Sequence, residues 1–171
     1  LGPTDHVLEI GCGTGGTARK IAPVVAHVTA TDLSVEMIRI ARSRSGGDAA
    51  GTPEFFQAEA AQDIPGQTFE VICAFSLLHL VDDIPTVPDA AFSQLKPGGH
   101  FISKTVCLKD APRWMRTMVC VLMAVRIAPN VIILNRAELT RYLIGAGFEI
   151  EQTRYFGKNR LNPFIVARKP A

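Results

Sequence analysis

The sequence lacks the features that would mark several common classes of protein. Its four cysteines, Cys12, Cys73, Cys107 and Cys120, lie far apart without a CxxC pair, so neither a zinc site nor a disulfide framework is expected. The net charge of +2 is too small to imply a polyanionic partner, and no basic run marks a nucleic-acid surface. The most apolar stretch, Met118 to Val125, is far shorter than the roughly 20 residues of a membrane span. We therefore expect no metal, no nucleic-acid partner, no transmembrane segment and a reduced, cytoplasmic setting.

What the sequence does contain is an alternation of strand-like and helix-like segments. With 171 residues, of which 47% are hydrophobic, the chain is long enough to bury one core, which predicts a single domain over residues 1–171. The alternation is typical of an α/β fold in which helices cover a parallel sheet, and Ser34 is a predicted N-cap. Strands are expected at His6–Ile10, His27–Thr31, Glu54–Gln57, Phe69–Phe75 and His100–Val106, and helices at Gly15–Val25, Ser34–Ser45 and Ile84–Leu95.

The pattern changes after the fifth expected strand. Asp110 to Ala128 is predicted to be a helix with Pro112 in its first turn and a broad apolar surface, within an insertion at about residues 107–135. Three roles are open for it: lining an apolar substrate pocket, facing a partner, or packing in the core. Beyond it we expect a helix at Arg136–Ile144 and an antiparallel hairpin of Phe148–Phe156 and Pro163–Arg168 across the link at 157–160.

The beginning of the chain suggests missing sequence. Leu1 is not a methionine, and the first expected strand follows within a few residues. No signal peptide is recognisable in these residues. We therefore expect further sequence before Leu1, including a lid over the site.

A glycine-rich loop follows the first expected strand. Gly11-x-Gly13-x-x-Gly16 matches the dinucleotide-binding fingerprint, in which a tight turn needs a permissive backbone and lets a ligand approach the main chain. Asp32 lies 21 residues after Gly11, at the end of the second strand, where a ribose-binding carboxylate belongs. On these residues alone, a nicotinamide dinucleotide is a serious candidate ligand.

Glu9 helps to decide between a dinucleotide and a second candidate ligand that also contains a ribose. It lies two residues before Gly11, where a dinucleotide would bring its pyrophosphate and like charges would repel. S-adenosylmethionine instead carries an ammonium and a sulfonium, which a carboxylate attracts, while the following helix N-terminus suits its own carboxylate. Glu9 therefore favours the cationic ligand.

Several motifs carry a family resemblance. Val7-Leu8-Glu9-Ile10-Gly11-Cys12-Gly13-Thr14-Gly15 resembles motif I of the class I S-adenosylmethionine-dependent methyltransferases, and four further motifs follow in the family's order. In two of them glutamate, Glu59 and Glu70, stands where aspartate is commoner. The further motifs are Thr31-Asp32-Leu33-Ser34 with Met37, Phe56 to Ala60, Phe69 to His79, and the turn Leu95 to Gly99 before the fifth strand.

The resemblance implies a fold, a reaction and a set of binding residues. The expected fold is a Rossmann-like three-layer α/β/α sandwich with a mostly parallel seven-stranded sheet, order 3-2-1-4-5-7-6, whose last strand is antiparallel. The expected reaction moves a methyl group from S-adenosylmethionine to an O, N or C nucleophile of a small, apolar or amphiphilic molecule, leaving S-adenosylhomocysteine. The implied cofactor residues are Glu9, Gly11, Cys12, Gly13 and Thr14 at the methionine end, Asp32 at the ribose, Leu33, Glu59 and Ala60 at the adenine, Met37 in the segment that follows Asp32, and Ala74, Phe75 and Ser76 near the methyl group.

Catalysis is expected to need few side chains, because displacement at a sulfonium mainly requires alignment and exclusion of water. His79 follows the fourth strand and is the candidate general base, with a purely structural role as the alternative. Asp82 and Asp83 are interpreted as a solvated turn before Pro85 rather than as ligands of a polar substrate.

Two other functions stay open at this point. The glycine fingerprint keeps an NAD(P)-dependent oxidoreductase in view, and a catalytically silent partner subunit would bind S-adenosylmethionine with the same motifs. A nucleobase substrate is not expected, since the loop Ala74 to Leu78 lacks the Asn/Asp-Pro-Pro-aromatic signature. Nothing in the sequence indicates an oligomeric state.

Overall fold

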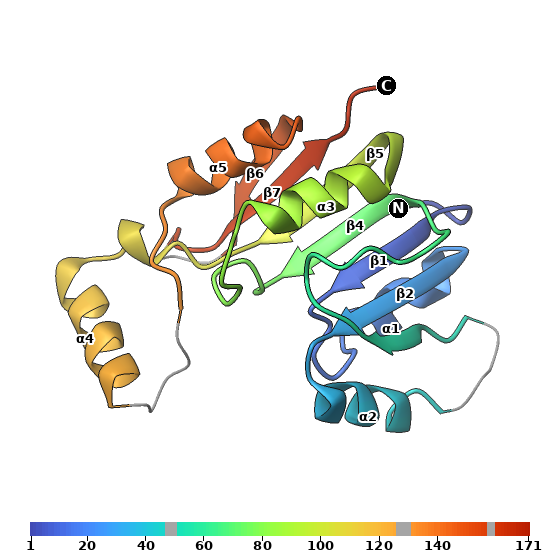
Figure 1. Cartoon of the computed structure of the whole chain (residues 1–171), viewed down its shortest axis with the longest axis horizontal. Coiled ribbons are helices and arrows are strands. Elements are labelled where there is room, and N and C mark those ends of the chain that lie inside the picture. Colours follow the sequence, from blue (N-terminus) through green and yellow to red (C-terminus); the bar gives the residue numbers. More distant parts are fainter. Residues whose placement is uncertain (47–50, 126–130, 157–159) are drawn as a thin grey trace.

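The fold is built on one seven-stranded sheet (Figure 1). The computed structural model describes residues 1–46, 51–125, 131–156 and 160–171. Within them the strand order is β3-β2-β1-β4-β5-β7-β6, with β7 antiparallel to both neighbours and the other pairs parallel. The elements are β1 (His6–Ile10), α1 (Ala18–Ile21), η1 (Ala22–Val24), β2 (His27–Asp32), α2 (Val35–Ser43), β3 (Glu54–Gln57), β4 (Phe69–Phe75), α3 (Thr86–Gln94), β5 (Leu95–Lys104), η2 (Leu108–Asp110), α4 (Arg113–Ala124), α5 (Arg136–Gly145), β6 (Glu149–Tyr155) and β7 (Pro163–Arg168).

Helices cover both faces of the sheet and give it two cores. On one face, α1 and α2 contribute residues such as Ile21 and Ile38 to a cluster with the central strands. On the other, α3 and α5 contribute residues such as Val87 and Leu143 to a larger cluster. The central strands are buried on both sides, as parallel strands between helix layers must be. The expected Rossmann-like sandwich, its strand order and its antiparallel last strand are confirmed.

Most element positions agree with the sequence. Ser34 caps α2, its hydroxyl accepting the Met37 backbone N–H at 3.3 Å, as predicted. The hairpin is also confirmed, with Glu149 opposite Arg168 and Tyr155 opposite Pro163, although 157–159 of its link lie outside the described residues. No described helix is long and apolar enough to cross a membrane.

Several boundaries differ from the prediction, most clearly those of α1 and β5. The helix expected from Gly15 begins only at Ala18 and passes into a 3-10 turn at Ala22, because Pro23 cannot donate to an α-helical ladder. The turn expected at Leu95 to Gly99 belongs to β5 instead, since buried Leu95 pairs with Phe69 across a register shift. This strand then ends at Lys104, two residues before the predicted end.

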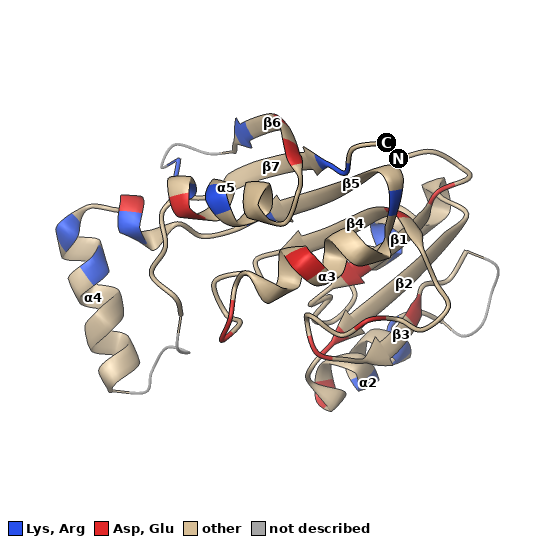
Figure 2. Cartoon of the chain, turned by 45° about the horizontal axis from the view of Figure 1, so that its top comes forward, with Lys and Arg blue, Asp and Glu red and all other residues tan. Residues whose placement is uncertain are grey.

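The insertion after β5 contains α4, which stands apart from the sheet and its covering helices (Figures 1 and 2). The predicted helix ran to residue 128, of which 126–128 lie outside the described residues. No residue of α4 is buried, so the core-packing role considered for it is wrong.

Candidate functional site

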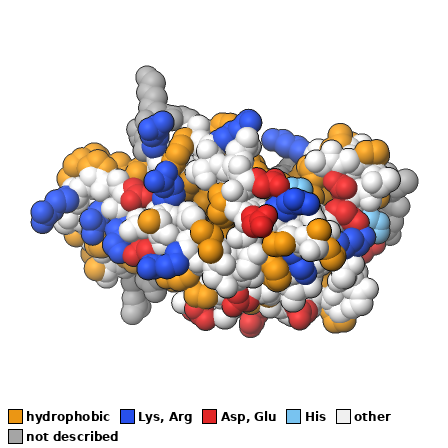
Figure 3. Space-filling view, turned by 90° about the horizontal axis from the view of Figure 1, so that it is seen from above, with side chains coloured by type: hydrophobic (Ala, Val, Ile, Leu, Met, Phe, Trp, Pro, Cys, Tyr) orange, Lys and Arg blue, Asp and Glu red, His pale blue; other side chains and the backbone are white. Residues whose placement is uncertain are grey.

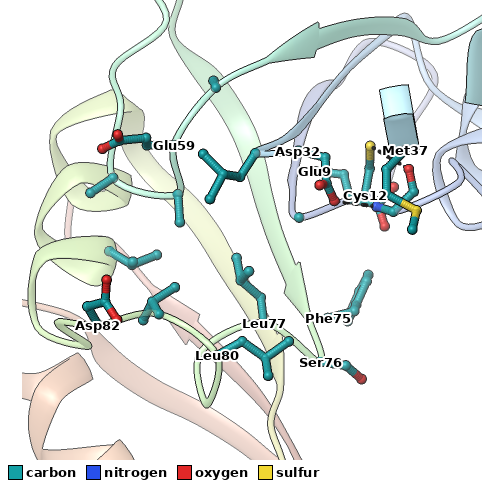
Figure 4. A pocket seen from close by; sticks show the side chains of 18 of the residues that line it. Glu9, Cys12, Asp32, Met37, Glu59, Phe75, Ser76, Leu77, Leu80 and Asp82 are labelled. Carbon is teal, nitrogen blue, oxygen red and sulfur yellow. Dashed lines mark hydrogen bonds between the residues drawn. The ribbon is translucent and has the colours of Figure 1, made fainter. Parts of the chain in front are cut away.

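A cavity of about 880 Å³ opens where the carboxyl ends of β1, β2 and β4 meet (Figure 4). The strand order reverses between β1 and β4, and such a switch point is where open α/β sheets bind ligands. The cavity is large enough for a cofactor together with part of a small acceptor. Its walls come from the loops after β1, β2, β3 and β4 and from the beginning of α3.

The loop after β1 depends on two glycines for space. Gly11 has a φ of 69°, and a Cβ there would lie 2.7 Å from Leu77 Cδ1. Gly15 has a φ of 72°, and a Cβ there would lie 2.6 Å from the Phe55 ring. Gly16, the third fingerprint glycine, has no such contact within 4 Å and no positive φ. In dinucleotide-binding domains that third glycine permits close helix packing, a reason that does not apply here.

Asp32 ties the two loops of the cavity together. Its Oδ2 accepts the Gly13 backbone N–H at 2.8 Å, and its Oδ1 accepts the Ser34 backbone N–H at 2.9 Å. The Cys12 N–H adds a bond to the Thr31 carbonyl at 2.8 Å. Because each carboxylate oxygen has two lone pairs, Asp32 keeps acceptor capacity for hydroxyl groups in the cavity.

Glu9 is a buried carboxylate that lines the cavity. It is 2% exposed, and burial raises its pKa from 4.5 to about 7, although hydrogen bonds from the Ala18 backbone and the Thr17 hydroxyl oppose the rise. Among the described residues, no donor lies within hydrogen-bond distance of its Oε2. A buried carboxylate with one oxygen left unpaired is costly, and a cationic group in the cavity would relieve that cost. Glu9 also raises the pKa of Cys12, to about 12, after the larger effect of burial.

The cavity is long, and its two ends differ. Cys12 and Met37 lie at one end in Figure 4, and Glu59 and Asp82 lie at the other. Leu33, just after β2, also lines the cavity and leaves two thirds of its surface exposed, at 66%. An exposed apolar side chain beside polar groups is suited to the face of a planar, partly polar ligand.

Ser76 holds the loop after β4 in a strained conformation. Its φ is 56°, in the left-handed region that costs a non-glycine residue about 1–2 kcal/mol. The Ser76 N–H donates to the Lys104 carbonyl at 2.7 Å, which fixes this conformation. Phe75, Ser76 and Leu77 consequently form the cavity wall beneath the loop after β1.

The predicted cofactor residues come together at this cavity, with two exceptions. Thr14 lies outside the lining, where its carbonyl accepts the Arg19 guanidinium at 2.9 Å, and Ala74 is fully buried in the core. The lining includes the predicted residues Glu9, Gly11, Cys12, Gly13, Asp32, Leu33, Met37, Glu59, Ala60, Phe75 and Ser76. It also includes residues for which no cofactor role was expected, namely Thr17, Ala58, Ala61, Leu77, Leu80, Val81, Asp82, Asp83, Thr86 and Val87.

His79 lies behind the cavity wall and is not part of the lining. The side chain is buried at 9% exposure, and burial lowers its pKa. Its Nδ1 has no hydrogen-bond partner among the described residues, while its carbonyl accepts the Ile132 N–H at 2.7 Å. The segment that returns from the insertion is therefore hydrogen-bonded to the backbone of this histidine.

The whole-chain pattern matches a known family. A family model described as a methyltransferase domain matches residues 2–153. This chain belongs to the class I S-adenosylmethionine-dependent methyltransferases. This family membership rules out the interpretation of the glycine fingerprint as a nicotinamide-binding loop. Two residues agree with it, because Glu9 would repel a pyrophosphate and Gly16 lacks the close packing that a dinucleotide-binding loop requires.

Relatives of this methyltransferase chain occur among curated proteins and solved structures. The ubiquinone biosynthesis O-methyltransferase of Xylella fastidiosa (strain 9a5c) is 31% identical over 154 residues, which are 85% of this chain and 61% of that protein. The chain thus spans about three fifths of that relative's length. A methyltransferase from Methanosarcina mazei superposes with a TM-score of 0.82 at 20% identity, covering 99% of this chain and 94% of that one. The N-methyltransferase NodS of Bradyrhizobium japonicum WM9, solved with S-adenosylhomocysteine, gives 0.75 at 18% identity, covering 98% and 80%.

Proposed function

We propose that this chain transfers a methyl group from S-adenosylmethionine to a small apolar or amphiphilic acceptor. The observation that carries the proposal is the buried carboxylate of Glu9, whose Oε2 has no donor among the described residues, in the same cavity as the glycine loop and Asp32. A cationic amino acid group, a ribose and an aromatic base would each find suitable chemistry there. S-adenosylmethionine is the methyltransferase cofactor that combines all three.

The proposed cofactor position follows the cavity. Glu9 would hold the methionine end beside Cys12 and Gly13, because a carboxylate attracts the ammonium group. Asp32 would accept the ribose hydroxyls. The adenine would lie against Leu33, Glu59 and Ala60, Met37 would lie beside Cys12 at the opposite end, and the methyl group would face Phe75 and Ser76.

The reaction needs alignment more than it needs reactive side chains. The cofactor supplies a methyl group on a sulfonium, which leaves as a neutral thioether when the acceptor's lone pair forms the new bond. The walls at Phe75, Leu77 and Leu80 would hold the acceptor in line and keep water out. A hydroxyl or amine acceptor must also lose its proton.

We propose His79 as the base that takes this proton. Its lowered pKa keeps the imidazole neutral, the form that accepts a proton, and its Nδ1 is not already committed to a described partner. Because His79 does not line the cavity, this role requires the part of the loop after Ser76 to rearrange when substrate binds. His79→Gln should then lower kcat at least tenfold and flatten its pH profile, with cofactor binding unchanged. A fall in thermal stability with an unaltered pH profile would instead assign His79 a structural role.

The acceptor is proposed to be apolar or amphiphilic because apolar side chains dominate one wall. Leu77, Leu80, Val81 and Val87 line the cavity, with Asp82 and Thr86 at its end. The curated relative named above is an O-methyltransferase of ubiquinone biosynthesis, which supports an oxygen nucleophile on such a molecule. An O nucleophile is therefore preferred over N or C.

Calorimetry tests the cofactor assignment. S-adenosylhomocysteine should bind and NAD should not, and Asp32→Ala should weaken binding at least tenfold because it removes acceptors for the ribose. The matched control is Asp89→Ala, an exposed carboxylate on α3 outside the cavity, which should bind as the unmodified chain does. Tight NAD binding without any S-adenosyl ligand would overturn the proposal. Binding without turnover of labelled cofactor on a metabolite panel would favour the silent-subunit alternative.

A further inference from the structure

A groove lies between α5 and β6, away from the cavity at the carboxyl ends of the central strands. Its volume is about 490 Å³, and it shares no lining residue with that cavity. Figure 1 shows α5 lying along the side of the sheet that β6 and β7 form. The residues that line this α5 groove are Arg136, Ala137, Thr140, Arg141 and Ile144 of the helix and Thr153 of the strand.

One side of α5 forms the longer wall of the groove. The lining residues of the helix follow one another at intervals of one, three, one and three positions, which places them on the same side of a helix. Leu139 and Leu143, on the neighbouring side, are fully buried and fix the helix against the sheet. The groove is therefore held in shape by the core beneath α5.

β6 supplies the other wall because its pairing with β7 is irregular. The register shifts just before Gln152, and the extra residue of such a bulge changes which side chains face α5. Thr153 and Tyr155 lie two positions apart in the strand and so point to the same face. The Tyr155 hydroxyl accepts the Arg136 guanidinium at 3.1 Å, so this is the face that α5 covers. Arg154, which lies between them, belongs to the opposite face.

Arginine side chains gather at the groove without a carboxylate partner. Arg136 and Arg141 line it, and the Arg160 guanidinium lies 5.4 Å from the centre of the Tyr155 ring. Among the described residues, none of these three arginines forms an ion pair. In Figure 3, basic side chains gather over the half of the molecule on which α5 and β6 lie in Figure 1, whereas most acidic ones lie elsewhere. The groove therefore suits an anionic ligand.

Two acidic side chains near the beginning of α5 have other partners. Glu138 pairs with Lys109 and accepts the Asn135 backbone N–H at 2.9 Å. Asp110 accepts the Arg136 backbone N–H at 2.9 Å. These bonds already satisfy the N-terminus of the helix, and a cation placed there opposes the helix dipole. Helix stability thus does not account for the charge of Arg136.

We propose that the α5 groove binds the phosphate group of a small soluble ligand. A phosphate group accepts several hydrogen bonds at once, and the planar guanidinium fork matches its oxygens. Arg136 and Arg141 supply the charged donors, and the hydroxyls of Thr140 and Thr153 supply neutral donors from the two walls. Ile144, which is 58% exposed, contacts the rest of the ligand. The volume of the groove is in the range of small-molecule sites.

The test titrates the whole chain with soluble anions at constant ionic strength. Inorganic phosphate and pyrophosphate should shift the arginine side-chain resonances and the Thr140 and Thr153 amide resonances in nitrogen-15 NMR spectra, and the shifts should saturate. Acetate, a planar monoanion, should produce much smaller shifts. Equal shifts with acetate would overturn the proposal, because they would indicate diffuse attraction. A response to phosphatidylglycerol vesicles without any response to the soluble anions would also overturn it.

Matched variants separate the groove from the net charge of the chain. Arg141→Gln should weaken pyrophosphate binding about tenfold because it removes a charged donor, and Thr153→Val about threefold because it removes a neutral one. The control Arg154→Gln removes the same charge from the opposite face of β6 and should leave the affinity within about twofold. Equal losses from Arg141→Gln and Arg154→Gln would contradict a site in the groove. Circular-dichroism melting should be the same for all three variants, because the three side chains are exposed.

Anion binding is measured without S-adenosylhomocysteine or a methyl acceptor. Because the groove shares no lining residue with the cofactor cavity, failure of anion binding would leave the proposed methyl transfer untouched, and the reverse also holds. S-adenosylhomocysteine should not displace pyrophosphate. Competition between the two would place the anion in the cofactor cavity and overturn the proposal.

Discussion

The two regions beside the sheet's carboxyl edge are constructed in opposite ways. The loops after β1 and β2 are joined by the bonds of Asp32 to Gly13 and Ser34, and Gly11 fits tightly against Leu77. The insertion after β5 holds a helix with no buried residue. The loops after β1 and β2 are held in shape by their own bonds, whereas α4 in the insertion has an apolar side that faces outward. The predicted cofactor residues that line the cavity lie within the segment that runs from β1 to the loop after β4, and no residue of α4 is among them.

The two regions meet at the loop after β4. The Ile132 N–H donates to the His79 carbonyl at 2.7 Å, and the Lys109 N–H donates to the Leu134 carbonyl at 3.0 Å. These bonds close the base of the insertion against the wall of the cavity.

The largest effect is expected where the rigid region is tightest. Gly11→Ala adds a Cβ 2.7 Å from Leu77 Cδ1 and forces a non-glycine residue to a φ of 69°. We expect a loss of about 2–4 kcal/mol of unfolding free energy. Calorimetry should show S-adenosylhomocysteine binding weakened by about 100-fold or more, because the loop no longer fits the ligand.

The control for this substitution is the neighbouring third glycine of the fingerprint. Gly16→Ala meets nothing within 4 Å and has no positive φ to strain, so stability and affinity should change little. If both substitutions lowered stability and affinity equally, the whole loop would be sensitive to substitution, and the contact of Gly11 with Leu77 would not explain the effect.

Much of this rigid region could be predicted from the sequence, because its constraints are local. A turn that needs glycine, a carboxylate at a strand end and the serine cap at Ser34 each leave a residue type at a fixed offset. The order of motifs then implied the strand order, which the structure has. The spacing rule selected Gly16 rather than Gly15, however, since only the packed structure reveals the Phe55 ring beside Gly15.

The parts that the sequence did not predict depend on what lies next to them in space. Asp82 and Asp83 were interpreted as a solvated turn; they are exposed, and they also line the cavity, because strand order brings the loop after β4 to it. The apolar pattern of α4 indicated an apolar contact but not its partner, so burial in the core was an equal option. The spacing of apolar residues shows that one face of a helix is apolar, but only the folded structure shows what covers that face.

An intermediate effect is expected from the charge of Glu9. Its pKa of about 7 in the free domain means that the folded state holds a proton between pH 4.5 and 7 that the unfolded state releases. Stability should therefore fall as pH rises through this window, by up to about 3 kcal/mol, and stay level above it. S-adenosylhomocysteine affinity should rise about tenfold from about pH 6 to about pH 8, because its ammonium binds the ionised carboxylate.

Glu9→Gln is the matched variant, since it keeps the size of the side chain and removes its titration. Affinity should be lower and independent of pH across the same window, and the pH slope of stability, measured by urea unfolding, should largely disappear. If the pH dependence of affinity survived unchanged in Glu9→Gln, another group would control ligand binding.

The smallest effect should come from the outward-facing region, and it tests the comparison most directly. Trp114→Ala changes a large side chain that is 65% exposed on α4, so unfolding free energy should change by less than about 0.5 kcal/mol. Leu143→Ala, on α5 and fully buried, should cost about 2–5 kcal/mol in the same urea titration. A comparable cost for Trp114→Ala would mean that α4 packs on the domain in solution, and its apolar side would then be part of the fold. A negligible cost would agree with a helix that has no buried residue.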